Sequence, residues 1–341
     1  MKKVLRCAVF NLSREWGQEE YALRVRLARE GILCVDFTKT EWSLIKRNED
    51  TVVLTDSPQT GAKLAREGIV YVGCCHAMDT RINQNSATKA TDADMVSCWF
   101  DGAALVLEGF EEVDARYLEE WMLRTKGHPV TIARTKRLLI REISDKDIPE
   151  LERIGRTCGG AEAKEEPIEE TNVKMNEGIS YAGENICKER ELHVQGNRFT
   201  KEYLYPYRRT AYRLQGFGLW SVLYRNRVIG CCGFEPWDEK LETAESDAQS
   251  PAGMRPDRTD KIMQYHLTLR EVSAESLGII LEMQYMLDPA YHRQGFGTEM
   301  CRASLACARE RLDADEVRLR IREGNLASRA LAEKLGFVSE L

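Results

Sequence analysis

A glycine-containing turn in the last quarter of the chain is the feature best suited to chemistry. The apolar run 277–287 predicts a strand that ends at Asp288-Pro289, and residues 291–298 read Tyr-His-Arg-Gln-Gly-Phe-Gly-Thr before a helical pattern begins. The first turn of a helix carries unpaired backbone N–H groups and the positive end of the helix dipole, and glycines let an anion approach the backbone. The turn therefore predicts an anion site, although glycine turns before helices are also common as purely structural features.

Short elements on both sides would position this turn. Residues 317–321 alternate as a strand does, and a helix pattern that begins at Asn325 stops at Gly336-Phe337. Upstream, the patterns predict a strand over 137–143, a helix over 148–156 capped by 144–147, and a hairpin of strands 219–225 and 227–234 around Asn226. Stretches 159–200 and 238–274 have weak periodicity, so we expect a long loop or mobile lid in the first and an insertion in the second.

Residues 1–130 alternate strand-like and helix-like patterns, which predicts a separate small α/β domain with an open, mainly parallel sheet. The strand over 51–54 runs into Asp56 and Ser57, which either cap the next helix or place a functional group at a strand's carboxyl end. A hydrolase with Asp56 as nucleophile is an alternative, but no phosphate-binding glycine loop or second acidic motif accompanies it. Cys74-Cys75-His76 is not expected to hold a metal, because neighbouring strand residues point to opposite faces. We interpret this half as a scaffold or partner-binding domain.

The later motifs, taken together, resemble the acetyl-CoA-dependent GNAT N-acetyltransferases. The resemblance rests on the strand 277–287, on the loop His292–Gly297 at the place of the family's R/Q-x-x-G-x-G/A, and on the closing N-x-x-[AS]…E-K-L-G-F segment, Asn325–Phe337. The strand 137–143 and the segment Gly216–Trp220 fit best the branch similar to ribosomal-protein N-terminal alanine acetyltransferases. The family implies a mixed sheet flanked by helices, an α+β arrangement, over residues 137–341.

The resemblance also implies an activity, the transfer of an acetyl group from acetyl-CoA to a primary amine of a protein N-terminus, a lysine or a small molecule, with acetyl-CoA as cosubstrate and no metal. The residues that it assigns to cofactor binding are Met286, Leu287, His292, Arg293, Gln294, Gly295, Phe296, Gly297, Thr298 and Asn325. Backbone N–H groups at Met286–Leu287 would stabilise the oxyanion. Glu282, which alternation places on one strand face with Gln284 and Met286, is the candidate base or else a structural partner of an arginine or a backbone group. Ser328 could protonate the leaving thiolate, or be an ordinary first-turn serine, and Asn325 could cap its helix as well as bond the cofactor.

Three departures from the family pattern matter for function. His292 replaces the usual Arg or Gln, so one side-chain contact to the cofactor is open. Ala332 stands where many members carry a tyrosine as general acid, and only four residues follow Phe337, so we expect the closing strands to be short or absent. A catalytically degenerate acyl-CoA sensor or regulatory protein therefore remains an alternative to an enzyme.

Composition limits the classes of partner. The 341 residues are 43% hydrophobic and 30% charged with a net charge of −6, which indicates a globular two-domain chain and does not favour binding to a phosphate backbone. No apolar run is long enough to span a membrane. Eleven cysteines without a CxxC pair indicate reduced thiols of a cytoplasmic protein. The expected partner is an amine-bearing acceptor, a small molecule or a protein N-terminus, without nucleic acid or membrane, and a homodimer is left open.

Overall fold

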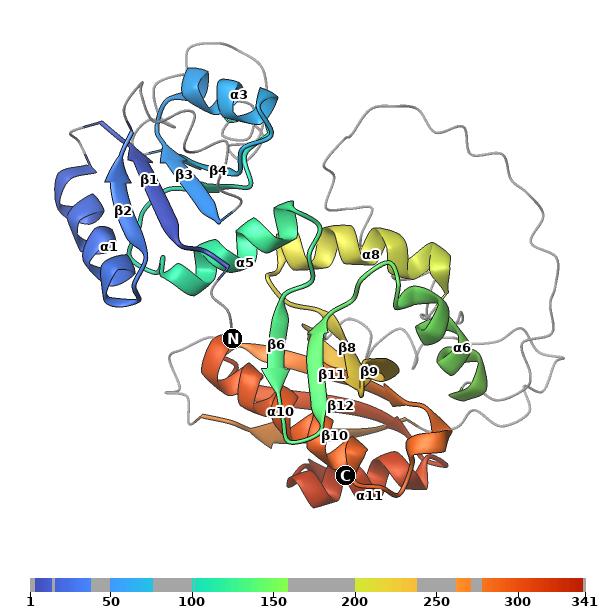
Figure 1. The fold of residues 1–341 in the computed structure, drawn as a ribbon. Coiled ribbons are helices and arrows are strands. Elements are labelled where there is room, and N and C mark those ends of the chain that lie inside the picture. Colours follow the sequence, from blue (N-terminus) through green and yellow to red (C-terminus); the bar gives the residue numbers. More distant parts are fainter. Residues whose placement is uncertain are drawn as a thin grey trace, which may run out of the picture. The chain divides into compact units, whose positions relative to one another are not determined.

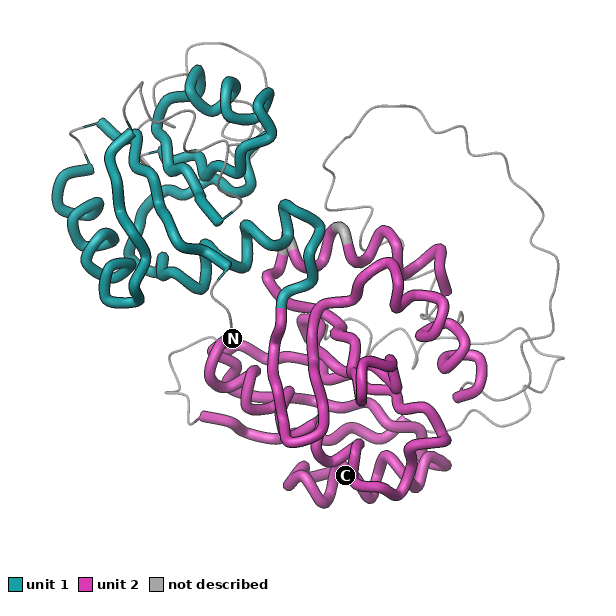
Figure 2. The backbone as a smooth tube through the Cα atoms, in the orientation of Figure 1, with its two compact units in different colours: residues 1–130 teal, residues 131–341 magenta. Residues whose placement is uncertain are grey.

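The structure is a computed structural model that describes residues 4–13, 16–37, 50–75, 100, 102–158, 200–237, 262–270 and 278–339. The chain divides into two compact units, residues 1–130 and 131–341 (Figure 2). Among the described residues, no helix is both long and apolar enough to cross a membrane. The same residues contain no disulfide.

The first unit is an open sheet of five parallel strands (Figure 1). Its elements are β1 Cys7–Asn11, α1 Gly17–Arg29, β2 Leu33–Asp36, β3 Thr51–Thr55, α3 Pro58–Arg66, β4 Tyr71–Cys74, β5 Leu105–Leu107 and α5 Ala115–Thr125. The strand order is β2-β1-β3-β4-β5, and every residue of the central strand β3 is buried. Because side chains alternate, Val52 and Leu54 pack with α1 and α5, whereas Val53 packs with α3. The predicted small parallel α/β sheet is thus confirmed.

The second unit is a mixed sheet of eight strands. Its elements are β6 Thr131–Arg134, β7 Leu138–Glu142, α6 Ile148–Cys158, α8 Lys201–Leu214, β8 Leu219–Tyr224, β9 Arg227–Pro236, β10 Ile262–Thr268, β11 Ile280–Leu287, a 3₁₀ turn Pro289–Tyr291, α10 Phe296–Arg311, β12 Glu316–Arg322, α11 Leu326–Leu335 and β13 Val338–Ser339. The strand order is β13-β10-β12-β11-β9-β8-β7-β6. Among the strands that the structure describes in this sheet, only the pair β11–β12 is parallel. The predicted mixed sheet flanked by helices is confirmed.

Two cores hold helices to the two faces of this sheet. On one face, Leu281 and Met283 of β11 pack with Met300 of α10 and Ala332 of α11. On the other face, Met286 of β11 packs with residues of α6 and α8. The side chains of β11 therefore alternate between the two cores, as the sequence pattern predicts.

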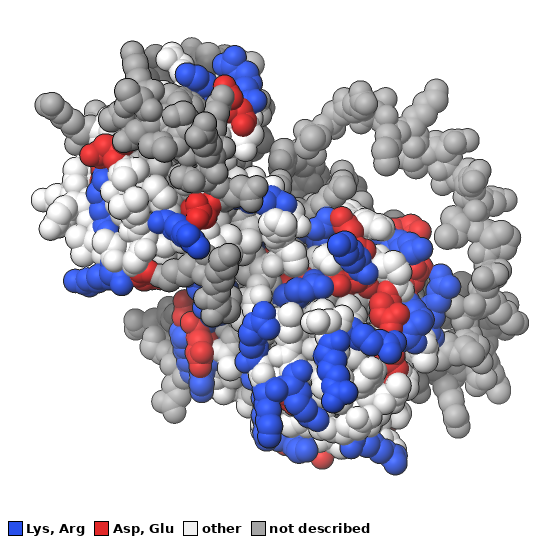
Figure 3. Space-filling view, in the orientation of Figure 1, with Lys and Arg blue, Asp and Glu red and all other residues white. Residues whose placement is uncertain are grey.

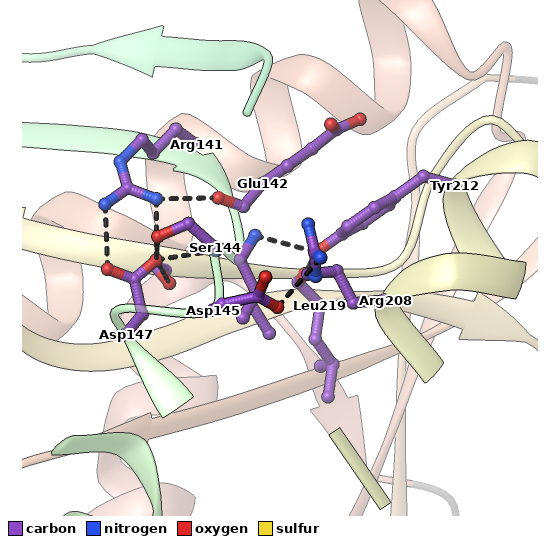
Figure 4. Close-up of polar contacts among 10 residues, drawn as sticks. Arg141, Glu142, Ser144, Asp145, Asp147, Arg208, Tyr212 and Leu219 are labelled. Atoms are coloured by element: carbon purple, nitrogen blue, oxygen red, sulfur yellow. Dashed lines mark hydrogen bonds and ion pairs between the residues drawn. The ribbon is translucent and has the colours of Figure 1, made fainter. Parts of the chain in front are cut away.

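A network around Asp147 fastens α6 to the sheet (Figure 4). The carboxylate of Asp147 accepts hydrogen bonds from both terminal nitrogens of Arg141 at 2.6 and 2.8 Å, from the backbone N–H and the hydroxyl of Ser144, and from the Ser221 hydroxyl at 3.0 Å. Burial by itself would raise the pKa of Asp147, but the hydrogen bonds from Arg141 and Ser144 outweigh it and hold that pKa below its usual value. The predicted cap of this helix is thus also its link to β7 and β8.

Two elements differ from the sequence-based expectation. The stretch 238–274, expected to be an insertion, contains β10, which pairs along seven residues with β12 and also with β13. The closing strands were expected to be short or absent, and β13 has two residues. Strand β10 supplies the pairing that an inner strand such as β12 needs. Helix α8 was also missed, although Thr200 caps it by accepting a hydrogen bond from the Tyr203 N–H at 3.4 Å. The predicted long loop or lid over 159–200 lies outside the described residues except for Thr200.

Candidate active site

The central strands β11 and β12 separate at the middle of the sheet. Their pairing ends at Glu282–Arg318, although β11 continues to Leu287 and β12 to Arg322. On its other side β11 stays paired with β9 as far as Leu287. The last part of β11 thus presents one backbone edge that β12 does not cover.

The direction of the backbone groups on this edge follows from the pairing with β9. The Asp288 N–H donates to the Ile229 carbonyl at 2.8 Å, and the Ile280 carbonyl accepts from Trp237, so the even-numbered residues of β11 turn toward β9. Alternation then turns the N–H groups of Tyr285 and Leu287 toward the gap. Of the two N–H groups predicted to bind the oxyanion, that of Leu287 faces the gap, whereas that of Met286 faces β9.

The glycine turn opens α10 next to this edge. Gly295 has φ +80°, a left-handed conformation that favours glycine, and it offers no side chain to cap the helix that starts at Phe296. The first N–H groups of the helix are consequently available to an external anion. A Cβ on Gly297 would lie 3.5 Å from Leu331 of α11 and 4.0 Å from Leu287. The turn, the end of β11 and α11 therefore meet at one place.

Side chains of the turn fold back onto the strand end. The His292 Nε2 lies 2.9 Å from the Leu287 carbonyl oxygen, and the Gln294 amide donates to the Ala290 carbonyl at 2.9 Å. The exposed Arg293 has φ +58°. His292 thus helps to hold the conformation of the turn, so the residue that departs from the family pattern has a structural role. Thr298 lies in the first turn of α10 and is half-buried.

The start of α11 approaches the same strand. The Asn325 side chain caps the helix by accepting a hydrogen bond from the Ser328 N–H at 3.1 Å, as predicted. The Tyr285 hydroxyl donates to the Ser328 carbonyl at 3.4 Å, and burial raises the pKa of Tyr285 to about 12. Ala332 is fully buried in the core. A tyrosine from β11 therefore lies near the part of α11 where Ser328 stands.

Glu282 lies on the opposite face, beside a second carboxylate. Its Oε2 accepts a hydrogen bond from Arg320 of β12 at 2.8 Å, so the structural role considered for it is present. Glu235 of β9 stands directly across from it and is buried. The carboxylate of Glu235 accepts hydrogen bonds from the Gln284 amide at 3.0 Å and the Tyr203 hydroxyl at 3.5 Å. Sequence reasoning missed Glu235, for which the signal was a lone carboxylate at the end of the apolar run 228–234.

Two arginines complete this face. The guanidinium of Arg320 lies 4.0 Å from the centre of the Trp237 ring, and that of Arg318 lies 4.9 Å from it. Arg318 also forms an ion pair with Glu316 at 2.5 Å. Arg318 and Arg320 on β12 thus lie next to the carboxylates of β11 and β9. On the face drawn in Figure 3, further lysine and arginine side chains gather over the β6–β7 turn of this unit.

The acidic candidate in the first unit has a structural explanation. The Ser57 hydroxyl caps α3 by accepting a hydrogen bond from the Thr60 N–H at 3.2 Å, and Asp56 accepts one from the Ser13 N–H at 2.6 Å. Cys74 and Cys75 are both buried, and His76 lies outside the described residues. Within the ranges that the structure describes, no group of three or more His, Cys, Asp or Glu is arranged to hold a metal ion.

Comparison with known proteins agrees with this geometry. Residues 181–338, which include β8 to β13, match the family described as acetyltransferase (GNAT) domain. No curated protein matches the chain in sequence.

Several solved structures resemble part of the chain. A putative GNAT-family acetyltransferase from Bordetella pertussis is 16% identical, with 60% of this chain and 87% of that chain covered and a TM-score of 0.32. A RimL ribosomal L7/L12 alpha-N-protein acetyltransferase is 12% identical, with 62% and 86% covered and a TM-score of 0.35. The putative acetyltransferase yncA from Salmonella typhimurium is 15% identical, with 60% and 80% covered and a TM-score of 0.30.

The separated central strands and the glycine turn both lie within the matched residues. The chain carries a GNAT acetyltransferase domain at residues 181–338.

Proposed function

We propose that the protein is an N-acetyltransferase that moves an acetyl group from acetyl-CoA to a primary amine. The observation that carries the proposal is the uncovered edge of β11 beside the open N-terminus of α10. An edge with unpaired amide groups suits an arm that itself contains amides, and a helix N-terminus suits a diphosphate. Both features lie within a GNAT domain.

The residues present fit acetyl-CoA. The turn from His292 to Thr298 would hold the diphosphate through backbone N–H groups, with Gly295 leaving room for its approach. Leu287 would contact the cofactor through its N–H, which faces the gap, and Asn325 would bond it from the start of α11. Acetyl-CoA, when bound, supplies an activated thioester.

Three groups of this chain would act on the protons and charge of the transfer. Glu282 would accept a proton from the amine, directly or through water, while Arg320 holds its carboxylate in place. The Leu287 N–H, turned toward the gap, would stabilise negative charge on the acetyl oxygen. Ser328 would donate a proton to the leaving thiolate, and Tyr285, whose raised pKa keeps its hydroxyl protonated, lies beside it.

The acceptor is proposed to be cationic before it reacts. Glu235 and Glu282 stand opposite each other on β9 and β11, and Arg320 donates to Glu282, so this face offers carboxylate acceptors of the kind that suit a primary ammonium. A small-molecule amine and a protein N-terminus both satisfy this condition. An α-amino group, with a pKa of about 7.7–8.0, loses its proton more readily than a lysine with about 10.4.

An acetyl-CoA turnover assay with a panel of amines tests this function. We expect release of the free CoA thiol to accelerate when a suitable small amine or peptide N-terminus is added. Binding of acetyl-CoA without release under any acceptor would instead favour the sensor alternative. A chain that binds no CoA would contradict both.

A further inference from the structure

A turn between β6 and β7 reaches across to the glycine turn that opens α10. Thr135 and Leu138 close this turn through hydrogen bonds, and Thr135 and Arg137 both contact Glu299 in the first turn of α10. We propose that Arg137, with Thr135 and Glu299, is a positioning clamp that holds the turn 294–298 in its ligand-binding conformation before CoA arrives. This inference rests on the proposed function, because it assigns these residues to the same site.

The clamp is made of short contacts that converge on one carboxylate. The Thr135 hydroxyl donates to the Glu299 Oε1 at 2.5 Å, and the Arg137 backbone N–H donates to the same oxygen at 3.0 Å. The Arg137 Nε donates to the other oxygen at 2.6 Å. Burial by itself would raise the pKa of Glu299, but the hydrogen bonds from Thr135 and Arg137 outweigh it and lower that pKa. Glu299 is therefore an ionised anchor in the first turn of α10.

A further donor of Arg137 acts on the backbone of the glycine turn itself. Its Nη1 donates to the Gln294 carbonyl at 3.0 Å. In a trans peptide the carbonyl and the following N–H point in opposite directions, so this bond turns the Gly295 N–H away from Arg137. The Arg137 guanidinium also lies 4.0 Å from the centre of the Phe296 ring. One side chain thus fixes the peptide before Gly295 and the residue after it.

The packing below the turn explains why such a fixed point is useful. Phe296 is buried against Tyr224 and Tyr291, with ring centres 4.9 and 5.8 Å away. Gly295, by contrast, has no side chain and a left-handed φ, so nothing of its own restricts it. Arg137 supplies that restriction from another element. A turn that is ordered in advance binds more tightly, because the ligand does not bear the cost of ordering it.

Matched variants separate a clamp from a simple positive charge. Arg137→Ala and Glu299→Gln each remove one side of the clamp, and Arg137→Lys keeps the charge without the fork of donors. Lys136→Ala is the control for loss of charge in the same exposed turn, and Glu310→Gln is the control on the same helix. If the competent fraction of the turn falls to about a tenth, the Kd for CoA rises about tenfold.

Two measurements on the full chain decide the proposal. Without ligand, amide hydrogen exchange over 294–298 should accelerate in Arg137→Ala and Glu299→Gln and stay unchanged in both controls. With CoA, Arg137→Ala and Glu299→Gln should each raise the Kd for CoA and the KM for acetyl-CoA with little change in kcat. The double variant Arg137→Ala/Glu299→Gln should have the same Kd as the single variants. The Kd of Arg137→Lys should lie between those of Arg137→Ala and the unmodified chain. Unchanged exchange in Arg137→Ala and Glu299→Gln, or an equal loss of affinity in Lys136→Ala, would overturn the clamp. Absence of CoA binding by the unmodified chain would overturn the proposed function, while the exchange data still judge the clamp.

Discussion

At the scale of single residues, Glu282 carries the sharpest question. Its carboxylate accepts a hydrogen bond from Arg320, which holds it in place. Glu235 stands opposite it on the neighbouring strand β9 and supplies a second carboxylate. A positioned carboxylate can accept a proton, and the same contacts would also suit a purely structural ion pair. A substitution that keeps the shape separates the two roles.

Glu282→Gln is predicted to slow acetyl transfer by about 10²- to 10⁴-fold, which is the usual loss when a general base is removed. The deficit should shrink at high pH, because more of the acceptor amine is then already neutral. CoA affinity should barely change, since the turn that would bind the diphosphate lies beyond the end of β11.

Glu316→Gln is the matched control, because Glu316 forms a similar ion pair with Arg318 on the same face. Steady-state rates across pH, together with CoA titration, are the measurement. If Glu282→Gln unfolds the chain, or transfers at the normal rate per bound complex, Glu282 is structural.

Local signals made some site residues predictable and hid others. Asn325 was identifiable as a cap because an N-cap acts on the residue three positions later. Glu235 depends on pairing between β9 and β11, and neither its burial nor its opposition to Glu282 follows from neighbouring residues. The clamp of Arg137 with Glu299 escaped for the same reason, since 162 residues separate the two.

At the scale of elements, a buried carboxylate fastens α6 to the sheet alongside their shared apolar core. Asp147 bonds to Arg141 of β7 and to Ser221 of β8. It also accepts a hydrogen bond from Ser144, just before its own helix. Helix α6 in turn reaches the strand end by an ion pair between Arg153 and Asp288. Asp147 and Arg153 thus help to hold α6 against the strand whose uncovered edge is the candidate site.

Asp147→Asn is predicted to lower the free energy of unfolding of the second unit by about 3–5 kcal/mol, because it removes the buried carboxylate and leaves the partly buried Arg141 without its counter-charge. The lowered pKa adds a pH dependence. The ionised carboxylate contributes its full stability above its unfolded pKa of about 3.9, and this contribution is lost as pH falls through the lower folded pKa.

Denaturant unfolding between neutral pH and strongly acidic pH measures this effect. In the acidic range, the free energy of unfolding of the unmodified chain should fall to that of Asp147→Asn. Asp145→Asn is the control, because Asp145 forms a more exposed ion pair with Arg208 (Figure 4). Equal stability of Asp147→Asn and the unmodified chain at neutral pH would contradict this account.

Elements with strong local patterns were predictable, and those defined by distant partners were not. The hairpin of β8 and β9 turns at Arg225 and Asn226, both with positive φ, where the sequence placed it. Strand β10 is only seven residues long, and it is defined by its pairing with β12, which follows it by some fifty residues. Its neighbours in the sequence are polar, so the strand was included in an insertion.

At the scale of the whole molecule, the two units have separate cores and distinct sheets. The described polar residues at the carboxyl ends of β1 and β3 bond to one another, as Asn11 does with Thr55 at 2.8 Å and Ser13 with Asp56. Such mutual bonds indicate a structural use of these groups. We therefore propose that the transfer chemistry belongs to the second unit, which contains the matched residues.

Asp56→Asn in the full chain is predicted to leave acetyl transfer within about twofold of the unmodified rate, because an amide oxygen can still accept the Ser13 hydrogen bond. General phosphatase substrates should give no turnover in either protein. Hydrolysis that disappears in Asp56→Asn would show a second active site in the first unit.

The most direct measurement of the central claim is CoA binding to a chain in which the glycine turn is blocked. Gly295→Glu adds a negative charge and a strained side chain at φ +80°, whereas Gly216→Glu adds the same charge at φ +74° in open space elsewhere in the unit. At a hundredfold excess over Kd, CoA should stabilise the unmodified chain and Gly216→Glu by about 2.7 kcal/mol. Gly295→Glu should be folded, as judged by circular dichroism, but should show no such stabilisation by CoA and so no rise in melting temperature. An equal gain in Gly295→Glu would contradict the assignment of the site.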